Sequence, residues 1–416
     1  MSRFRFVHAG DLHLDSPLVG LSQKSRDVAE RIDNASRRAF NNLISLATEE
    51  ECAFVLIAGD VFDGNWRDYR TGLFFVDGMR RLKSANIPAF IVLGNHDAEN
   101  RFASRLKFAE NVHLFSPKKA ETRRIDELAV AVHGRSYPQR DVMENLASTY
   151  PPPIEGFFNI GLLHTACAGR VGYEPYAPCT VEQLVNYGYD YWALGHIHGY
   201  EKLNENPHVV YSGNLQGRQL RESGAKGAVL VTVEEGTITD VNHHALDIVR
   251  WDVADVDVSG AADLHTIEDL TRARLRRCID AADGRAVAAR VRLFGETNLY
   301  GELLKGRSAL AEEMQTIAAD ISPDLWIERL QLDTTQPACA PVVDPTVSGK
   351  IKEVMRDLSI DTHSAQRLEA LLTDVKSKMP AAARVDELIN RLRKEVPRRA
   401  LELAISVVDG PETSTR

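Results

Sequence analysis

Five short clusters of metal-binding side chains constrain this chain more than any other feature. Each follows or ends a run of apolar β-forming residues, the pattern of a buried strand. Functional groups in an open α/β sheet lie at the carboxyl ends of its strands. Asp, Asn and His bind metals such as Mn²⁺, Zn²⁺ and Fe²⁺. The clusters are Gly10–Asp15 (GDLHLD), Gly59–Asp63 (GDVFD), Gly94–Asp97 (GNHD), Leu162–Thr165 (LLHT) and Gly195–His198 (GHIH).

Strand and helix patterns alternate in the first hundred residues. Strands are predicted at 4–9, 54–57 and 89–93, with helices at 26–51 and 69–84 between them. This order implies a largely parallel sheet with right-handed crossovers. The many later strands predict an α/β fold with two packed sheets and flanking helices. Those strands are expected at 112–115, 128–133, 158–164, 191–194, 208–212, 228–233 and 237–243, with helices at 140–149 and 181–187.

The pattern changes near residue 245. Strands predicted at 245–249, 287–294 and 325–332 alternate with helices at 266–282 and 308–320, which is typical of a small α+β domain. The stretch 335–341 (TQPACAP) has the composition of a linker. Residues 346–407 are predicted to be helical, with breaks at Pro380 and Pro397. We therefore expect domains at 1–245, 246–335 and 336–416. The last either docks on a partner or packs on its own domains.

Bulk properties favour a cytoplasmic protein without a membrane span. No apolar run approaches the ~20 residues that a membrane helix needs. The start of the chain lacks the apolar region of a signal peptide, and five scattered cysteines are typical of reduced thiols. The formal charge of -9 argues against strong DNA affinity of the chain alone, although a local basic patch stays open.

Two metals about 3.5–4 Å apart hold the attacking and leaving oxygens of a phosphate, and a carboxylate must bridge them. Asp60 is the predicted bridge. A hydroxide between the metals would be the nucleophile. His96 would stabilise the transition state and protonate the leaving oxygen, and Asp97 would orient that imidazole or support a ligand. One metal would take Asp11, His13 and His198, and the other would take Asn95, His164 and His196.

These clusters resemble the calcineurin-like metallophosphoesterase superfamily, and within it the SbcD-type DNA repair nucleases. Further stretches are similar to the bacterial YhaO-like exonuclease branch. They are HAGDLHLDSPLVGL (8–21), YAPCTVEQL (176–184), YDYWALGHIHGYE (189–201) and SGNLQGRQLRESGAKG (212–227).

The resemblance implies a four-layer αββα sandwich, a small α+β capping domain and a C-terminal helical region. It implies Mn²⁺-dependent hydrolysis of phosphodiester bonds in DNA, with Zn²⁺, Fe²⁺ and Mg²⁺ as alternative ions. The family's ligand positions correspond to the seven residues assigned above, with His96 catalytic. Archaeal and eukaryotic members carry a histidine three residues after the bridging aspartate. Asp63 stands there in this chain, so a phosphate contact of that histidine cannot be transferred.

The resemblance also implies partners. An SMC-like coiled-coil ABC ATPase of the SbcC/YhaN type is expected, and a homodimer is a further expectation. Two other functions stay open from the sequence: a phosphodiesterase for small nucleotides, and a non-catalytic subunit of an ATPase complex.

Some residues near the clusters are candidate DNA contacts. Solvated surface charge is the default for the basic residues, with phosphate contact favoured slightly for Arg218 and Arg221. His8 is predicted to be buried and not a ligand. The other candidates are Arg67, Arg70 and Lys226 for phosphates, and Trp66, Tyr173 and Tyr176 for stacking on bases.

Overall fold

The structure is a computed structural model, and it divides into two compact units. The first unit comprises Met1–Val253, Arg277–Arg290 and Asp324–Glu328, and the second comprises Ala254–Arg276, Val291–Pro323 and Arg329–Arg416. The described residues are 3–18, 32, 34–63, 69–98, 106, 108–167, 174–337, 350, 362–378 and 385–408.

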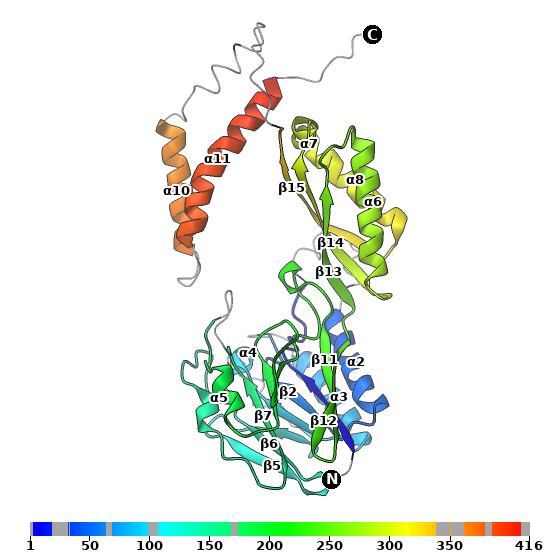
Figure 1. The fold of residues 1–416 in the computed structure, drawn as a ribbon, viewed down its shortest axis with the longest axis vertical. Coiled ribbons are helices and arrows are strands. Elements are labelled where there is room, and N and C mark those ends of the chain that lie inside the picture. Colours follow the sequence, from blue (N-terminus) through cyan, green and yellow to red (C-terminus); the bar gives the residue numbers. More distant parts are fainter. Residues whose placement is uncertain are drawn as a thin grey trace. The chain divides into compact units, whose positions relative to one another are not determined.

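Two six-stranded sheets form the body of the first unit (Figure 1). In the first sheet the neighbours β1, β2, β3 and β4 are parallel, whereas β11 pairs antiparallel with β1 and β12. Its order is β12 (Thr237–Ala245), β11 (Gly227–Glu234), β1 (Phe4–Ala9), β2 (Phe54–Ala58), β3 (Ala89–Val92) and β4 (Val112–Leu114).

The second sheet is parallel at its centre, where β7 pairs with β6 and β8. Its outer strands β5 and β9 are antiparallel to their neighbours. The order is β5 (Glu121–Ile125), β6 (Val130–Gly134), β7 (Phe158–His164), β8 (Tyr191–Gly195), β10 (His208–Tyr211) and β9 (Glu201–Glu205).

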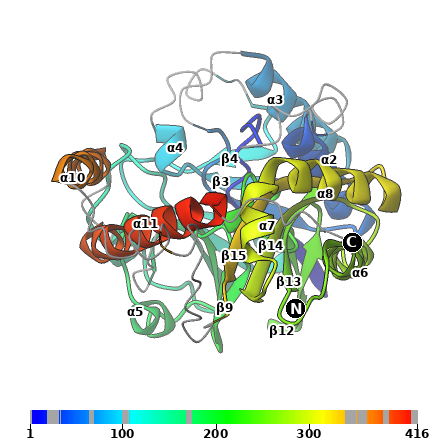
Figure 2. The same ribbon diagram turned by 90° about the horizontal axis from the view of Figure 1, so that it is seen from above.

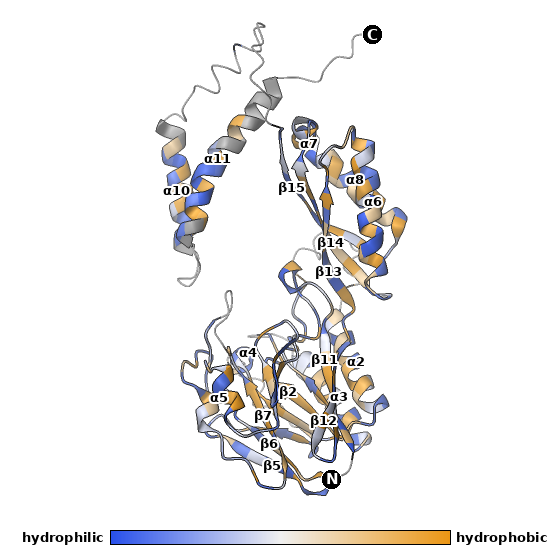
Figure 3. Cartoon of the chain, in the orientation of Figure 1, coloured by the Kyte–Doolittle hydropathy of each residue, from blue (hydrophilic) through white to orange (hydrophobic). Residues whose placement is uncertain are grey.

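Apolar side chains between the two sheets form the main core. Phe6 stacks on Phe54 with ring centroids 4.9 Å apart, and Tyr191 of the opposite sheet meets Phe6 edge-on at 5.3 Å. The inner strands are correspondingly apolar in Figure 3. Helices α2 (Ala35–Glu49) and α3 (Tyr69–Ser84) pack on the outer face of the first sheet. The turn η3 (Leu146–Thr149) and the short helix α5 (Val181–Val185) cover the second. The predicted αββα sandwich is confirmed.

A third sheet contributes residues to both units. Its order is β13 (Val249–Asp257), β14 (Ala286–Glu296) and β15 (Leu325–Thr335). The second unit also holds α6 (Leu264–Asp280) up to Arg276, α7 (Tyr300–Lys305) and α8 (Arg307–Ile321). Helices α10 (Thr362–Lys378) and α11 (Val385–Val408) lie side by side (Figure 2) and pack through Leu372 and Ile389. Among the described residues, no helix is long and apolar enough to cross a membrane.

Several predicted elements have different bounds. The helix expected at 26–51 is interrupted at Asn34, which adopts a left-handed backbone with φ 59°; Ile32 before it is helical, and α2 begins at Ala35. Residues 26–31 and 33 lie outside the described part. The helix expected at 140–149 is wrong, since only the turn η3 forms and the carbonyl of Val142 accepts from the amide of Ala177. The strand expected at 245–249 is also wrong, because the amides of Leu246 and Asp247 turn towards the carbonyl of Lys226.

Two polar edge strands, β5 (ETRRI) and β9 (EKLNE), were not predicted. The break expected at Pro397 is absent, since α11 continues through that residue. Pro380 lies outside the described residues.

Candidate metal centre

The predicted site residues lie at the carboxyl ends of strands from both sheets. Strands β1, β2 and β3 are parallel neighbours in the first sheet, and β7 and β8 are parallel neighbours in the second. Their carboxyl ends therefore gather the functional side chains. Asp11 and His13 follow β1, Asp60 follows β2, Asn95, His96 and Asp97 form α4 (Asn95–Ala98) after β3, His164 ends β7, and His196 and His198 follow β8.

Four of these residues have positive φ angles although they are not glycines. The values are 50° for Asp11, 40° for His13, 47° for Asp60 and 101° for His196. Such conformations are uncommon and cluster at functional sites. The segments after β1 and β2 hold each other: the amide of Asp11 donates to the carbonyl of Gly59 (2.9 Å), and that of His13 to Asp60 (3.0 Å). The site is thus built on a rigid backbone.

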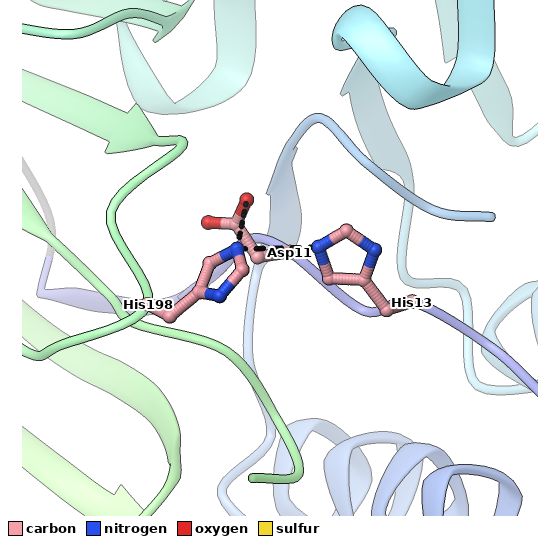
Figure 4. A group of neighbouring side chains, drawn as sticks. All are labelled: Asp11, His13 and His198. Atoms are coloured by element: carbon pink, nitrogen blue, oxygen red, sulfur yellow. Dashed lines mark hydrogen bonds and ion pairs between the residues drawn. The ribbon is translucent and has the colours of Figure 1, made fainter. Parts of the chain in front are cut away.

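Asp11, His13 and His198 form the first group of potential ligands (Figure 4). Nε2 of His13 lies 3.3 Å from Nε2 of His198, which lies 3.8 Å from Oδ1 of Asp11. One ligand atom from each residue falls within 4.8 Å of the others. This is the set predicted for one metal.

The second group surrounds His164. Its Nδ1–H donates to the carbonyl of Ala58 (2.8 Å), which leaves Nε2 as the lone-pair nitrogen, 3.0 Å from Oδ1 of Asn95. Oδ2 of Asp60 lies 3.5 Å from Nε2 of His164 and 3.9 Å from Nε2 of His13. Asp60 therefore lies between the two groups, as a bridging carboxylate must.

His196 borders the second group. Its ring centroid lies 5.2 Å from that of His164, and its Nε2–H donates to the carbonyl of Glu174 (3.0 Å). Its backbone amide donates to both carboxylate oxygens of Asp11, at 3.1 and 2.9 Å. His196 thus fixes Asp11 through its main chain and presents its ring beside His164.

Burial controls the protonation of these groups. It lowers the pKa of His13 to about 4 and the pKa values of His164 and His196 to about 3. These imidazoles are therefore neutral at pH 7, the form that binds a metal. Burial and the nearby Asp60 raise the pKa of Asp11 well above its ordinary range. Because cations would relieve this crowding of buried carboxylates, the donor set fits two divalent ions.

Comparison with known proteins decides the family. Residues 4–200 match the calcineurin-like phosphoesterases, and residues 251–335 match the middle domain of the metallophosphoesterase YhaO. The chain is 35% identical over 365 residues to YhaO of Bacillus subtilis, covering 85% of this chain and 88% of that relative. This chain is a calcineurin-like metallophosphoesterase. The predicted family membership is confirmed.

Weaker similarity reaches further proteins. The DNA double-strand break repair protein Mre11 of Sulfolobus acidocaldarius is 24% identical over 272 residues, covering 61% of this chain and 66% of that one. Mre11 of Methanopyrus kandleri is 25% identical over 299 residues, covering 66% and 62%. A solved dimetal phosphatase from Danio rerio is 12% identical, with a TM-score of 0.36 over 56% of this chain and 93% of that one. The metallophosphoesterase thus spans about two thirds of the length of these Mre11 relatives.

A third group of side chains in this metallophosphoesterase joins His96 to Asp63 and His13. Nδ1 of His96 lies 3.0 Å from Oδ1 of Asp63, and the hydroxyl of Ser16 donates to Oδ2 of Asp63 (2.7 Å). Burial disfavours charge on His96, but the contact with Asp63 raises its pKa above the ordinary value. Contact with the Asp63 carboxylate thus favours the protonated form of His96.

Asp97 has a different place from His96. Its carboxylate accepts from the amides of Val61 (3.1 Å), Phe62 (2.9 Å) and Gly94 (3.1 Å). Burial and the charge of Asp60 raise its pKa to about 7. One of the two roles predicted for Asp97, orientation of the His96 imidazole, is wrong, because Asp63 and not Asp97 contacts that imidazole. Asp97 instead holds the backbone that follows Asp60.

The metal centre opens into a cavity of about 560 Å³. Proposed ligands and basic side chains both line it. The lining residues are Asp60, Asn95, His96, Arg140, Glu174, Tyr176, His196, His198, Arg218, Gln219, Arg221 and Glu222. Such a cavity has the size of a small-ligand site and carries cations suited to phosphate oxygens.

The residues expected to contact DNA occupy different positions in the structure. Arg218, Arg221 and Tyr176 all line the cavity, and the guanidinium of Arg218 also lies against Glu222 (3.1 Å) and Asp63 (3.7 Å). Lys226 was expected at the surface, which is wrong: it is buried and its Nζ donates to the carbonyl of His198 (2.6 Å). Arg70 is exposed on α3, and Trp66, Arg67 and Tyr173 lie outside the described residues.

His8 is buried and contacts Tyr191 and Leu194, as expected of a histidine that is not a ligand. Two residues of the site were missed from the sequence. Asp63 was noted only as a departure from related nucleases, and Glu222 was not considered. Glu222 lies in the RQLRES stretch, and its position near two arginines was the one available signal.

Proposed function

We propose that this metallophosphoesterase is a DNA nuclease that hydrolyses phosphodiester bonds with two divalent ions, preferably Mn²⁺, in DNA repair. Exonuclease activity is the main expectation, with endonuclease activity as a second one. The carrying observation is Asp60, whose Oδ2 lies between Nε2 of His13 and Nε2 of His164. A carboxylate so placed is the bridge that a two-metal phosphoesterase needs.

Seven side chains would hold the ions, and bound ions supply Lewis-acid charge and an activated water. The proposed ligands are Asp11, His13, Asp60, Asn95, His164, His196 and His198. His96 and Asp63 would act on the leaving oxygen of the phosphate. Asp63 accepts from Nδ1–H of His96, so that Nε2–H is available to protonate the leaving oxygen. The water oxygen bonds to phosphorus as the water gives a proton to solvent, and the P–O ester bond breaks. The leaving oxygen takes the proton of His96 and departs as a hydroxyl, and His96 regains a proton from solvent.

Three observations favour DNA as the substrate. The chain is similar to relatives named DNA double-strand break repair protein Mre11. Arg140 and Arg221 line the cavity beside the metal centre, where they would contact phosphates that flank the scissile one. Tyr176 in the same wall offers a ring on which a base can stack.

A nuclease assay tests this proposal. The purified chain is incubated with end-labelled single- and double-stranded linear DNA and with Mn²⁺, Mg²⁺ or Zn²⁺ in parallel. We expect cleavage that is fastest with Mn²⁺ and lost in Asp60→Ala, which controls for contaminating nucleases. Hydrolysis of bis-p-nitrophenyl phosphate or cyclic nucleotides with intact DNA would overturn the DNA assignment and favour a small-nucleotide phosphodiesterase.

We also propose domains at 1–245, 246–335 and 336–416. The last of these domains is proposed to dock on an SMC-like coiled-coil ABC ATPase. Leu371 and Val375, one turn apart on α10, are 64% and 39% exposed. Such a pair is typical of a helix face that binds a partner. Leu371→Asp with Val375→Asp should abolish co-elution with the ATPase on size exclusion and leave hydrolysis of bis-p-nitrophenyl phosphate unchanged. Unchanged co-elution would contradict this docking face.

A further inference from the structure

A buried carboxylate beside the metal centre has no role in the reaction described so far. Glu222 ends the turn η4 (Leu220–Glu222) between β10 and β11, and only 5% of it is exposed. Its Oε1 lies 2.8 Å from Nδ1 of His198. Metal-binding histidines commonly donate their second ring N–H to a carboxylate, which fixes the tautomer and the ring orientation.

Glu222 is surrounded by hydrogen-bond donors. Its Oε2 accepts from Nδ2 of Asn214 (2.9 Å) and from the backbone amide of Arg218 (2.7 Å). Its Oε1 accepts from Nη2 of Arg218 (3.1 Å) and from Nδ1–H of His198. A carboxylate satisfies all four donors, whereas a glutamine would turn its NH₂ group towards two of them. The pocket is therefore built for a charged acceptor.

This contact determines which nitrogen of His198 faces the metal centre. Nδ1 of His198 lies nearer to Glu222 (2.8 Å) than to Nη2 of Arg218 (3.3 Å), so Nδ1–H is directed at the carboxylate. Nε2 then carries the lone pair, and Nε2 is the atom near Asp11 and His13. Loss of Glu222 would leave Nδ1–H of a largely buried ring without its acceptor. The ring would then lose both its preferred tautomer and its orientation.

Arg218 extends the contact to the opposite side of the site. Its Nη1 lies 3.7 Å from Oδ2 of Asp63, and Asp63 is the carboxylate that contacts His96. A continuous chain of charged contacts therefore runs from His198 through Glu222, Arg218 and Asp63 to His96. The same chain of contacts therefore holds His198, the proposed metal ligand, and His96, the proposed proton donor.

The backbone that carries this support is itself fixed. Oε1 of Gln216 accepts from the amides of Ile248 (2.8 Å) and Val249 (3.2 Å), and Nε1 of Trp251 donates to the carbonyl of Gly217 (2.9 Å). All of these residues belong to the first unit. Glu222 and Arg218 thus project from a segment that is anchored on the start of β13.

We propose that Glu222 is a positioning residue for phosphoester hydrolysis, which orients His198 as a metal ligand, and that Arg218 is a second one, which couples Glu222 to Asp63. This inference rests on the proposed ligand role of His198 and on the phosphoesterase reaction. It does not depend on whether the substrate is DNA.

The test uses Glu222→Gln in the full chain. Mn²⁺ affinity is measured by calorimetric titration after chelation, and kcat and KM are measured with bis-p-nitrophenyl phosphate. We expect Mn²⁺ binding to weaken by about 10–100-fold, the usual effect of removing such a partner. At saturating Mn²⁺, kcat should recover towards the wild-type value and KM should stay unchanged. Glu155→Gln, the same change at an exposed turn, should match the wild type in both assays.

Arg218→Lys is the second variant, because Glu222→Gln could fail to fold. A lysine keeps the charge but cannot contact both carboxylates. We expect kcat to fall at least about tenfold, with KM and Mn²⁺ affinity near wild type. A raised KM at unchanged kcat would instead make Arg218 a substrate contact and overturn the coupling. Wild-type Mn²⁺ affinity in folded Glu222→Gln would overturn the role of Glu222. The measured Mn²⁺ affinity therefore tests the role of Glu222 even if the chain cleaves no DNA.

Discussion

Nδ1 of His96 lies 3.0 Å from Oδ1 of Asp63, and this contact joins the segments that follow β3 and β2. The backbone amide of His96 also donates to Oδ1 of Asp60 (3.0 Å). His96 is therefore held at its ring and at its main chain by two carboxylates of one cluster. A proton donor fixed in this way reaches a leaving oxygen in one geometry, which is the condition for general acid catalysis.

Asp63→Asn should lower kcat for bis-p-nitrophenyl phosphate by about tenfold or more, because the neutral amide supports a protonated His96 less well. Steady-state kinetics at saturating Mn²⁺ check this. The metal content by elemental analysis should change much less than kcat. An equal loss of metal and activity would mean that Asp63 acts through His13, whose Nδ1 lies 3.6 Å from it.

His96→Ala should keep both ions and lose hydrolysis by about a hundredfold or more, the contribution typical of a general acid. His96 is assigned to the leaving oxygen and not to a metal, so elemental analysis should return wild-type stoichiometry. DNA hydrolysis at the wild-type rate in this variant would contradict its catalytic role.

Asp60→Ala should lose metal, because both groups of ligands share this carboxylate. Elemental analysis after dialysis against Mn²⁺ should find fewer ions than in the wild type, together with loss of hydrolysis. Asp126→Ala, at an exposed position in a surface turn, is the control. Retention of two ions in Asp60→Ala would exclude the bridging assignment.

Much of the fold and the grouping of the candidate site residues could be predicted because both depend on local patterns. The strand predicted at 158–164 has these same bounds in the structure, since a buried apolar run leaves little choice of conformation. The edge strands β5 and β9 carry mostly polar residues and have no comparable signal. Their conformation comes from pairing with β6 and β10.

The supporting residues could not be predicted because their partners are distant in sequence. Glu222 is 24 positions from His198, and Arg218 meets Asp63 from the segment between β10 and β11. The assignment of Asp97 to His96 followed sequence adjacency, whereas α4 directs Asp97 towards the amides of Val61 and Phe62. A sequence pattern predicts which residues lie at strand ends, but it does not predict which residues their side chains contact.

Gly195→Ala should destabilise the chain and weaken metal binding. A Cβ there would lie 1.9 Å from the carbonyl oxygen of Ala58, which also accepts from His164. The ends of β8 and β2 must then separate, at a cost of about 1–3 kcal/mol in the free energy of unfolding. Urea unfolding and Mn²⁺ titration measure the two effects. Gly199→Ala is the matched control, since its Cβ would meet nothing within 4 Å; equal behaviour of both variants would contradict the steric argument.

His8 should make the chain sensitive to acid. Tyr191 donates to its Nδ1 (3.0 Å) and its Nε2–H donates to the carbonyl of Leu194 (3.2 Å), so both nitrogens are used by the neutral ring. Burial lowers its pKa from 6.5 to about 3, and the bond to Leu194 opposes this only in part. The unfolded chain therefore binds the proton more readily. The contribution of neutral His8 to the free energy of unfolding is fully present above pH 6.5. It is lost as the pH falls towards 3.

The measurement compares wild type with His8→Gln, in which this position no longer titrates. Between pH 7 and pH 5, the wild type should lose about 2 kcal/mol more free energy of unfolding than the variant, because each pH unit below 6.5 contributes about 1.4 kcal/mol. Urea unfolding of metal-free protein at both pH values gives this difference, and the other buried histidines contribute equally to both chains. If the free energies of unfolding of the two proteins fell equally with pH, His8 would accept a proton in the folded chain. That result would contradict the closed environment that Tyr191 and Leu194 provide.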